Sequence, residues 1–207
     1  LQYFLNYNRN FGKHSVTGML MANQESWIKN SERLPFHLRG LASRLTYGYD
    51  DRYNFEFDAG YNGSEQFRKG NRYGLFPAVS AGWVASNEDF LKGNKTISFL
   101  KIRGSYGIVG NDQLGDQRFL YLDNITVGTG GFTGNLGEAH TVNEDYLGNP
   151  DLKWEIAKKS NLGIELGLFD QLNLTVDLFS ERRNNVLITR GTIPTLIGLA
   201  SRALPPI

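Results

Sequence analysis

The side chains best suited to metal binding are few and widely separated in this sequence. Its histidines are His14, His37 and His140, and it contains no cysteine. A zinc site uses His and Cys ligands at short, regular spacings, which these histidines do not have. We interpret them as ordinary surface or loop residues, and a chain without cysteine forms neither disulfides nor thiolate metal sites.

Two glycine-rich stretches are the other places where an ion or a phosphate group could be held. GNDQLGDQ (110–117) carries Asp112 and Asp116, but it lacks the alternating oxygen ligands and the terminal Glu of a calcium-binding loop. GTGGFTGNLG (128–137) does not complete the G-x-G-x-x-G pattern and follows no strand-to-helix pattern. The sequence therefore predicts no metal site and no cofactor.

Adjacent acidic residues are the candidates for acid–base chemistry. They occur at Asp50-Asp51, Glu88-Asp89 and Glu144-Asp145. Glycoside hydrolysis needs two carboxyl groups that flank the scissile bond, whereas neighbouring side chains on an extended strand point to opposite faces. We interpret all three pairs as turn residues. The sequence shows no nucleophile elbow either, so we predict no catalytic residues and no enzyme activity.

Aromatic side chains could stack on a sugar ring. Trp27, Trp83 and Trp154 lie near the ends of predicted strands, where a membrane protein places its interfacial aromatic residues. We predict that placement for all three. Stacking on a sugar is an alternative for Trp27 and for Phe132, but neither is assigned to a site, and the ligand-binding residues stay unknown at this level.

The overall composition excludes several classes of partner. The 207 residues carry 22 Lys and Arg against 21 Asp and Glu, a formal net charge of +1. This balance gives no electrostatic reason to expect nucleic acid as a partner. No run approaches the roughly 18 apolar residues of a membrane-spanning helix. The sequence begins in LQYFLNYNRN without a Met or a signal peptide and stops at ALPPI, so we expect both ends to be cut.

Alternating apolar and polar residues dominate the chain. In RYNFEFDAGYN (52–62), the odd-numbered positions from Tyr53 to Tyr61 are apolar or aromatic, and the even-numbered ones are polar or glycine. This period of two is typical of a β-strand with one apolar face. The same pattern predicts eight strands, at about 1–9, 13–24, 38–49, 53–63, 75–86, 98–108, 156–168 and 172–183. A further short strand is possible near 119–127.

The parity of the apolar positions constrains the turns. Paired residues share a face. If Tyr49 pairs with Tyr53, the loop between them must contain an odd number of residues, most compactly 50–52. The pairing of Leu168 with Leu172 likewise requires the loop 169–171. In the first hairpin the apolar positions change from odd-numbered to even-numbered residues, so its loop must contain an even number of residues, such as 9–12. The long segments join strands 2–3, 4–5 and 6–7, and the short links join the others. Short and long connections therefore alternate, which places all long loops at one end of the sheet.

A soluble β-sandwich and a transmembrane β-barrel both show such alternation. Sandwich strands usually run about 5–6 residues, whereas these run near 11, close to the 9–11 residues that a tilted strand needs to cross a bilayer. Aromatic residues at strand ends and one-sided long loops are also typical of outer-membrane barrels. The pattern favours an all-β, antiparallel up-and-down barrel wall with apolar residues facing lipid. A soluble carbohydrate-binding β-sandwich is the alternative.

Longer motifs from about residue 50 onward resemble the SusC/RagA family of TonB-dependent outer-membrane transporters. They are NRYGLFPAVSAGWVASNEDFL (71–91), ISFLKIRGSYGIVGN (97–111), NPDLKWEIAKKSNLGIELGLF (149–169), LNLTVDLFSERRNNVLI (172–188) and IPTLIGL (193–199). They stand in the order and at the spacing of the family. Each motif alone is weak, and the combination is specific.

The resemblance implies a 22-stranded barrel that is closed by an N-terminal plug, in the outer membrane of Bacteroidetes-type bacteria. It implies import of oligosaccharides or peptides, energised by TonB, with a SusD-like surface lipoprotein as partner. The plug, the TonB box and the signal peptide have no counterpart in this sequence, and eight strands cannot close such a barrel. Residues 1–207 are therefore expected to be a partial barrel domain.

Overall fold

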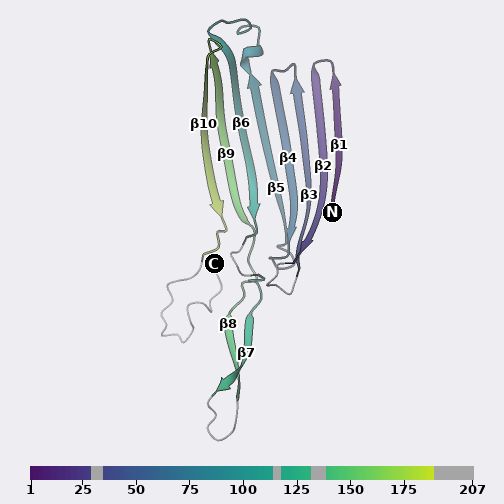
Figure 1. Ribbon diagram of the computed structural model, residues 1–207, viewed down its shortest axis with the longest axis vertical. Helices are drawn as coiled ribbons and strands as arrows, with labels where there is room; N and C mark the ends of the chain where they lie inside the picture. Colours follow the sequence, from purple (N-terminus) through teal and green to yellow (C-terminus); the bar gives the residue numbers. More distant parts are fainter. Residues whose placement is uncertain (29–34, 114–117, 132–138, 189–207) are drawn as a thin grey trace. The chain divides into compact units, whose positions relative to one another are not determined.

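Eight long strands form one antiparallel sheet in the computed structural model (Figure 1). The structure describes residues 1–28, 35–113, 118–131 and 139–188. The order across the sheet is β1-β2-β3-β4-β5-β6-β9-β10. These strands are β1 (Gln2–Phe11), β2 (His14–Trp27), β3 (Phe36–Tyr49), β4 (Tyr53–Ser64), β5 (Tyr73–Val84), β6 (Ile97–Asn111), β9 (Glu155–Leu168) and β10 (Leu172–Asn184). The predicted all-β antiparallel fold is confirmed, and all eight predicted strands occur, each end within three residues.

The turns have the predicted parity. β3 and β4 are joined by residues 50–52, and β9 and β10 by residues 169–171, as expected. In the first, Asp50 and Asp51 both have a φ of 52°, and the Arg52 N–H bonds the Tyr49 carbonyl at 3.0 Å. Two positive φ values in succession define a type I′ turn, whose twist matches that of the strands.

The first hairpin also has an even loop, but it is shorter than the predicted residues 9–12. Phe11 pairs with His14, which leaves only Gly12 and Lys13 in the turn. Gly12 has a φ of +60°, which glycine adopts without a steric penalty. Because glycine permits the two-residue turn, β1 extends two residues further toward the turn than the sequence pattern indicated.

Two compact units are present, and each is described separately. The first contains Leu1–Gly63, Tyr73–Asn111 and Ile156–Asn184, and so holds almost the whole large sheet. A 3-10 turn (Ala85–Asn87) follows β5 within this unit. The ends of the sheet strands that carry the tight turns lie together at the upper end of the sheet in Figure 1, and the strand ends that lead into the long connections lie at the other. The predicted one-sided arrangement is thus present.

The second unit is built from the described parts of Ser64–Arg72, Asp112–Glu155 and Asn185–Ile207. It contains a hairpin of β7 (Asn124–Gly131) and β8 (Ala139–Tyr146), which forms its own two-stranded sheet. The predicted short strand near 119–127 is only partly right, because β7 begins at Asn124. β8 was not predicted, since this glycine-rich region has no sustained alternation and its pairing contains register shifts.

Candidate functional site

The large sheet has two chemically different faces. The apolar face carries Tyr3, Leu5, Leu41, Tyr61, Leu75, Leu174 and Leu178, among others, and all of these side chains are exposed. Leu5 and Leu178 are each 66% exposed, so no second layer covers them within the described residues. A β-sandwich would bury this face against another sheet. The described structure therefore gives no support to the soluble alternative.

The extent of the apolar face matches the hydrocarbon layer of a membrane. On β4 it reaches from Tyr53 to Tyr61, a stretch of nine residues, and a tilted strand needs about 9–11 residues to cross a bilayer. Tyr53 stacks with Tyr49 at 6.4 Å at one limit, and Tyr61 stacks with Tyr73 at 5.2 Å at the other. These pairs occupy the positions of aromatic girdles. No helix among the described residues is long and apolar enough to span a membrane.

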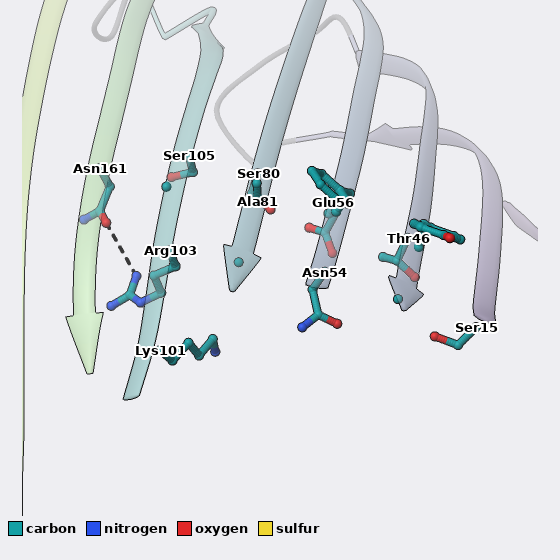
Figure 2. Close-up of a pocket in the computed structure, with 15 residues that line it drawn as sticks. Ser15, Thr46, Asn54, Glu56, Ser80, Ala81, Lys101, Arg103, Ser105 and Asn161 are labelled. Carbon is teal, nitrogen blue, oxygen red and sulfur yellow. Dashed lines mark hydrogen bonds between the residues drawn. The ribbon is translucent and has the colours of Figure 1, made fainter. Parts of the chain in front are cut away.

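The polar face is hollowed by an open cleft of about 380 Å³ (Figure 2). Hydroxyl, amide and charged side chains from several strands point into it. They include Ser15, Thr46, Asn54, Glu56, Ser80, Lys101, Arg103 and Asn161. Such groups can form hydrogen bonds with a hydrated solute or with another polar protein surface. We regard this face as the candidate functional site.

Arg103 is the centre of a charged network at the β10 side of the polar face. Its Nε lies 3.0 Å from Glu165 Oε1, and its Nη2 donates to both oxygens of Asp177 at 2.7 and 2.9 Å. Its Nη1 reaches Asn161 Oδ1 at 3.5 Å. The guanidinium thus links β6, β9 and β10. Because a planar guanidinium binds carboxylate in a fixed geometry, the network fixes three strands relative to one another.

A glycine makes this connection possible. Gly163 on β9 lies beneath the ion pair, and a Cβ there would be 2.7 Å from Asp177 Oδ1 and 2.8 Å from the Arg103 guanidinium carbon. Any larger residue would displace the side chain that crosses from β6 to β10. Strand alternation places Arg103, Glu165 and Asp177 on one face. It does not show that Gly163 leaves room for the contact between Arg103 and Asp177.

The same face continues into a second cleft of about 420 Å³ near β9 and β10. Phe179 lines it together with Asp58, Lys159 and Glu181. Phe179 interrupts the alternation of β10 and is 83% exposed. Arg44 extends the charged surface by pairing with Asp58 at 2.8 Å. The polar face is therefore a mixture of paired charges, small polar groups and a few exposed apolar residues.

A second charged network ties neighbouring tight turns together, and we call it the turn-end network (Lys13, Asp50, Arg52 and Glu88). Lys13 Nζ lies 2.9 Å from Asp50, and Arg52 lies 3.3 Å from Asp50 and 2.8 Å from Glu88. The Lys13 ammonium donates a hydrogen bond that holds the pKa of Asp50 below its ordinary value. These contacts join the turns that follow β1, β3 and β5.

Glu88 in this network also accepts hydrogen bonds from the girdle aromatics. The Tyr53 hydroxyl donates to it at 2.7 Å and the Trp83 Nε1–H at 3.1 Å. Hydrogen bonds from Tyr53 and Trp83, together with the charge of Arg52, lower the pKa of Glu88. The predicted turn role of Glu88-Asp89 and the interfacial placement of Trp83 agree with this geometry.

Trp154 corrects an expectation from the sequence. It is not part of an exposed girdle but is 7% exposed in the second unit, with its ring 5.3 Å from that of the fully buried Phe67. Its Nε1–H donates to the Arg72 carbonyl at 3.1 Å, and Asn71 Nδ2 donates to the Leu152 carbonyl at the same distance. These residues form a small loop core. Sequence patterns do not indicate this core, because its residues come from segments without periodicity.

The remaining candidates lie apart from one another. His14 is on β2 with its Nδ1 2.8 Å from the Tyr47 hydroxyl, His37 is on β3, and His140 is on β8. Asp50-Asp51 forms a turn as predicted, whereas the turn prediction for Glu144-Asp145 is wrong, because this pair lies in β8. Trp27 stacks on Phe36 at 5.3 Å. Asp116 and Phe132 fall outside the described residues. Within the described part of the chain, no group of three or more His, Asp or Glu residues could hold a metal ion.

Comparison with known proteins assigns this sheet to a family. The family described as "TonB dependent receptor-like, beta-barrel" matches residues 3–203. TonB-dependent receptor P39 of Formosa agariphila is 31% identical over 89% of this chain and 20% of its own length. TonB-dependent receptor SusC of Bacteroides thetaiotaomicron is 34% identical over 61% of this chain and 13% of its own length.

Solved structures agree on the fold. The RagAB peptide importer in its "closed-closed" state superposes with a TM-score of 0.80 at 23% identity, over 96% of this chain and 24% of that chain. Its "open-open" state gives 0.74 at 22% identity, over the whole of this chain and 25% of that one.

The fold and its two faces define a segment of an outer-membrane barrel wall. The chain belongs to the TonB-dependent receptor family, in its β-barrel region. The resemblance to SusC/RagA transporters is confirmed, and the family match extends from residue 3 rather than from about residue 50. The Formosa and Bacteroides relatives agree with the expected Bacteroidetes source. This is a family of transporters and receptors rather than of enzymes. The chain spans about a fifth of the length of the first curated relatives.

Proposed function

We propose that this chain forms part of the wall of a TonB-energised importer of oligosaccharides or peptides. The observation that carries the proposal is the single sheet with one exposed apolar face and one hollowed polar face. The apolar face suits lipid, and the polar face suits a water-filled lumen. The similarity to SusC and to the RagAB peptide importer supports nutrient import.

The domain organisation is part of the same proposal. Residues 1–207 would be part of the barrel domain of a longer protein, since the relatives are about five times longer. The plug, the TonB box and the signal peptide would then be encoded outside this segment. A SusD-like surface lipoprotein is the proposed partner on the side of the long connections, and the inner-membrane TonB complex would act through the plug.

The test is made in the source bacterium with the full-length gene. We expect its deletion to abolish uptake of at least one member of a panel of fluorescent oligosaccharides and peptides. Complementation with the wild-type gene should restore that uptake, and a protonophore should block it, because TonB draws on the inner-membrane proton gradient. The class of the lost substrate identifies the cargo. Unchanged uptake of the whole panel after deletion would contradict the proposal.

A variant of the β7–β8 hairpin tests whether the segment described here takes part in uptake. Replacing the β7–β8 hairpin (124–146) by a short Gly/Ser linker should reduce uptake while leaving the barrel folded, because among the described residues β7 and β8 form a separate two-stranded sheet and do not pair with the strands of the large sheet. Folding is checked by the shift in gel mobility between unheated and boiled samples. A folded variant with full uptake would show that the hairpin has no role in import.

A further inference from the structure

The apolar face is not uniformly covered by large side chains. Two adjoining hollows of about 520 Å³ and about 280 Å³ lie over β1 to β5. They share Tyr3, Ala22, Leu41 and Tyr61 in their linings. We call the combined hollow the outer groove. It lies at the end of the strands that leads into the long connections.

The groove exists because small residues stand between large ones. Ala22 faces Leu41 across β2 and β3, and Ser43 faces Leu20. Ala59 on β4 also lines the hollow. The Ser43 hydroxyl donates to the Ala59 carbonyl at 3.4 Å, so its polar atom has a partner. The floor is therefore dry and apolar, and it suits a hydrocarbon chain better than water.

The end of the groove nearest the long connections carries a positive charge. Arg39 lines it, is exposed, and stands opposite Gln24 in the strand register. Within the part of the chain that the structure describes, Arg39 makes no ion pair. The stacked rings of Tyr61 and Tyr73 lie beside it, 5.2 Å apart and nearly parallel. A guanidinium at the rim of an apolar groove matches the phosphate of an amphiphile.

We propose that the outer groove binds one membrane lipid, with an acyl chain along Ala22, Ser43 and Ala59 and an anionic phosphate head group on Arg39. The lipid tails around the barrel are as apolar as the groove, so the hydrophobic effect alone does not favour the groove over the bulk bilayer. Close packing against the tyrosine rings and the charge of Arg39 provide the selectivity. The proposal needs only the outer-membrane location of the family and does not depend on the cargo.

The test uses the purified full-length transporter in detergent and counts retained lipid by native mass spectrometry. Phosphatidylglycerol and phosphatidylcholine with identical acyl chains are titrated separately. We expect the wild type to retain one phosphatidylglycerol and to bind it at least threefold more tightly than phosphatidylcholine. In Arg39→Gln this preference should disappear. In Ala22→Leu/Ala59→Leu, which fills the groove with apolar atoms, binding of both lipids should weaken at least tenfold.

Matched controls lie on the same face, toward the tight turns. Ala81→Leu adds the same side chain outside the groove, and Arg9→Gln removes an arginine that lies over the Phe11 ring instead. Both should bind lipid as the wild type does. Equal lipid binding in the wild type and in the groove variants would overturn the proposal, and so would equal losses in the controls. Dimerisation through the groove without bound lipid would overturn it as well. If Ala22→Leu/Ala59→Leu does not fold, the lipid preference of Arg39→Gln compared with that of the wild type still tests the proposal.

Discussion

At the tight-turn end of the sheet, the single residue Glu88 connects the charged turns to the aromatic girdle. Glu88 receives hydrogen bonds from Tyr53, Trp83 and Arg52 at 2.7, 3.1 and 2.8 Å. All three groups donate to the Glu88 carboxyl group, and these bonds are strongest when that group is ionised. One acidic residue thereby fixes the tips of two interfacial aromatics and the neighbouring turn.

Glu88→Gln tests this linkage through its pH dependence. The folded state lowers the pKa of Glu88 below its ordinary value of 4.5. The stabilisation is therefore complete above pH 4.5 and is lost as the pH falls through the lowered pKa. We expect the variant to unfold at lower urea concentration than the wild type at pH 7, and the two curves to converge toward pH 3. Asp89→Asn is the control, because Asp89 reaches Arg52 only at 3.5 Å and is 86% exposed, so solvent screens that pair. An equal difference at pH 3 and pH 7 would contradict the assigned role.

Phe67 has a comparable role in the loop core. It is fully buried and packs against Trp154. Phe67→Ala removes a buried ring, which typically costs about 3–5 kcal/mol. We expect faster proteolytic cleavage within 64–72 and 112–155, with unchanged gel mobility of the folded barrel. Phe90→Ala should be cleaved at the wild-type rate because Phe90 is 70% exposed. A cleavage pattern identical to that of the wild type would show that the core does not order these loops.

At the scale of the strands, the Arg103 network depends on Gly163, which has no side chain at the point where the arginine crosses β9. Gly163→Ala would place a methyl group within 3 Å of both the guanidinium and Asp177. We expect the ion pair to break and the stability to fall by about 1 kcal/mol, which is the scale of a partly exposed salt bridge. Adding Arg103→Gln to Gly163→Ala should then cost little more. Urea unfolding of the four proteins in this cycle measures the coupling.

Gly82→Ala is the matched control for that cycle. It lies on the same face next to Arg103 in the register of β5 and β6, but a Cβ there meets no atom closer than 3.8 Å. Its effect should add independently to that of Arg103→Gln. Additive effects for Gly163→Ala as well would show that the glycine and the arginine are not coupled.

Strand alternation allowed most of the sheet to be predicted, and other interactions account for what was missed. A one-residue slip exchanges the two faces, so the apolar positions alone specify strand parity and loop parity, as at 50–52 and 169–171. The length of the first loop depended on the conformation of Gly12 instead. The loop core around Trp154 and the β7–β8 hairpin depend on contacts between non-periodic segments. The outer groove depends on which apolar positions carry small residues, which a binary pattern does not distinguish.

At the scale of the whole chain, the wall segment combines a surface for lipid with a surface for water in a single layer. Its stability cannot come from a buried core between two sheets, since many large apolar residues of the described strands are exposed and none is buried. The bilayer takes the place of that core, and backbone pairing along eight strands satisfies the polar groups that lipid cannot. The charged networks on the polar face then add strand-to-strand links where water is present.

The alternation of tight turns and long connections also sets an order of assembly. The β3–β4 and β9–β10 pairs close loops of three residues, whereas pairing β6 with β9 must close a connection of 43 residues, from 112 to 154. The entropy of closing the longer loop costs about 2 kcal/mol more. Hairpins should therefore form before they join, and the β6–β9 seam should be the last pairing to form and the slowest.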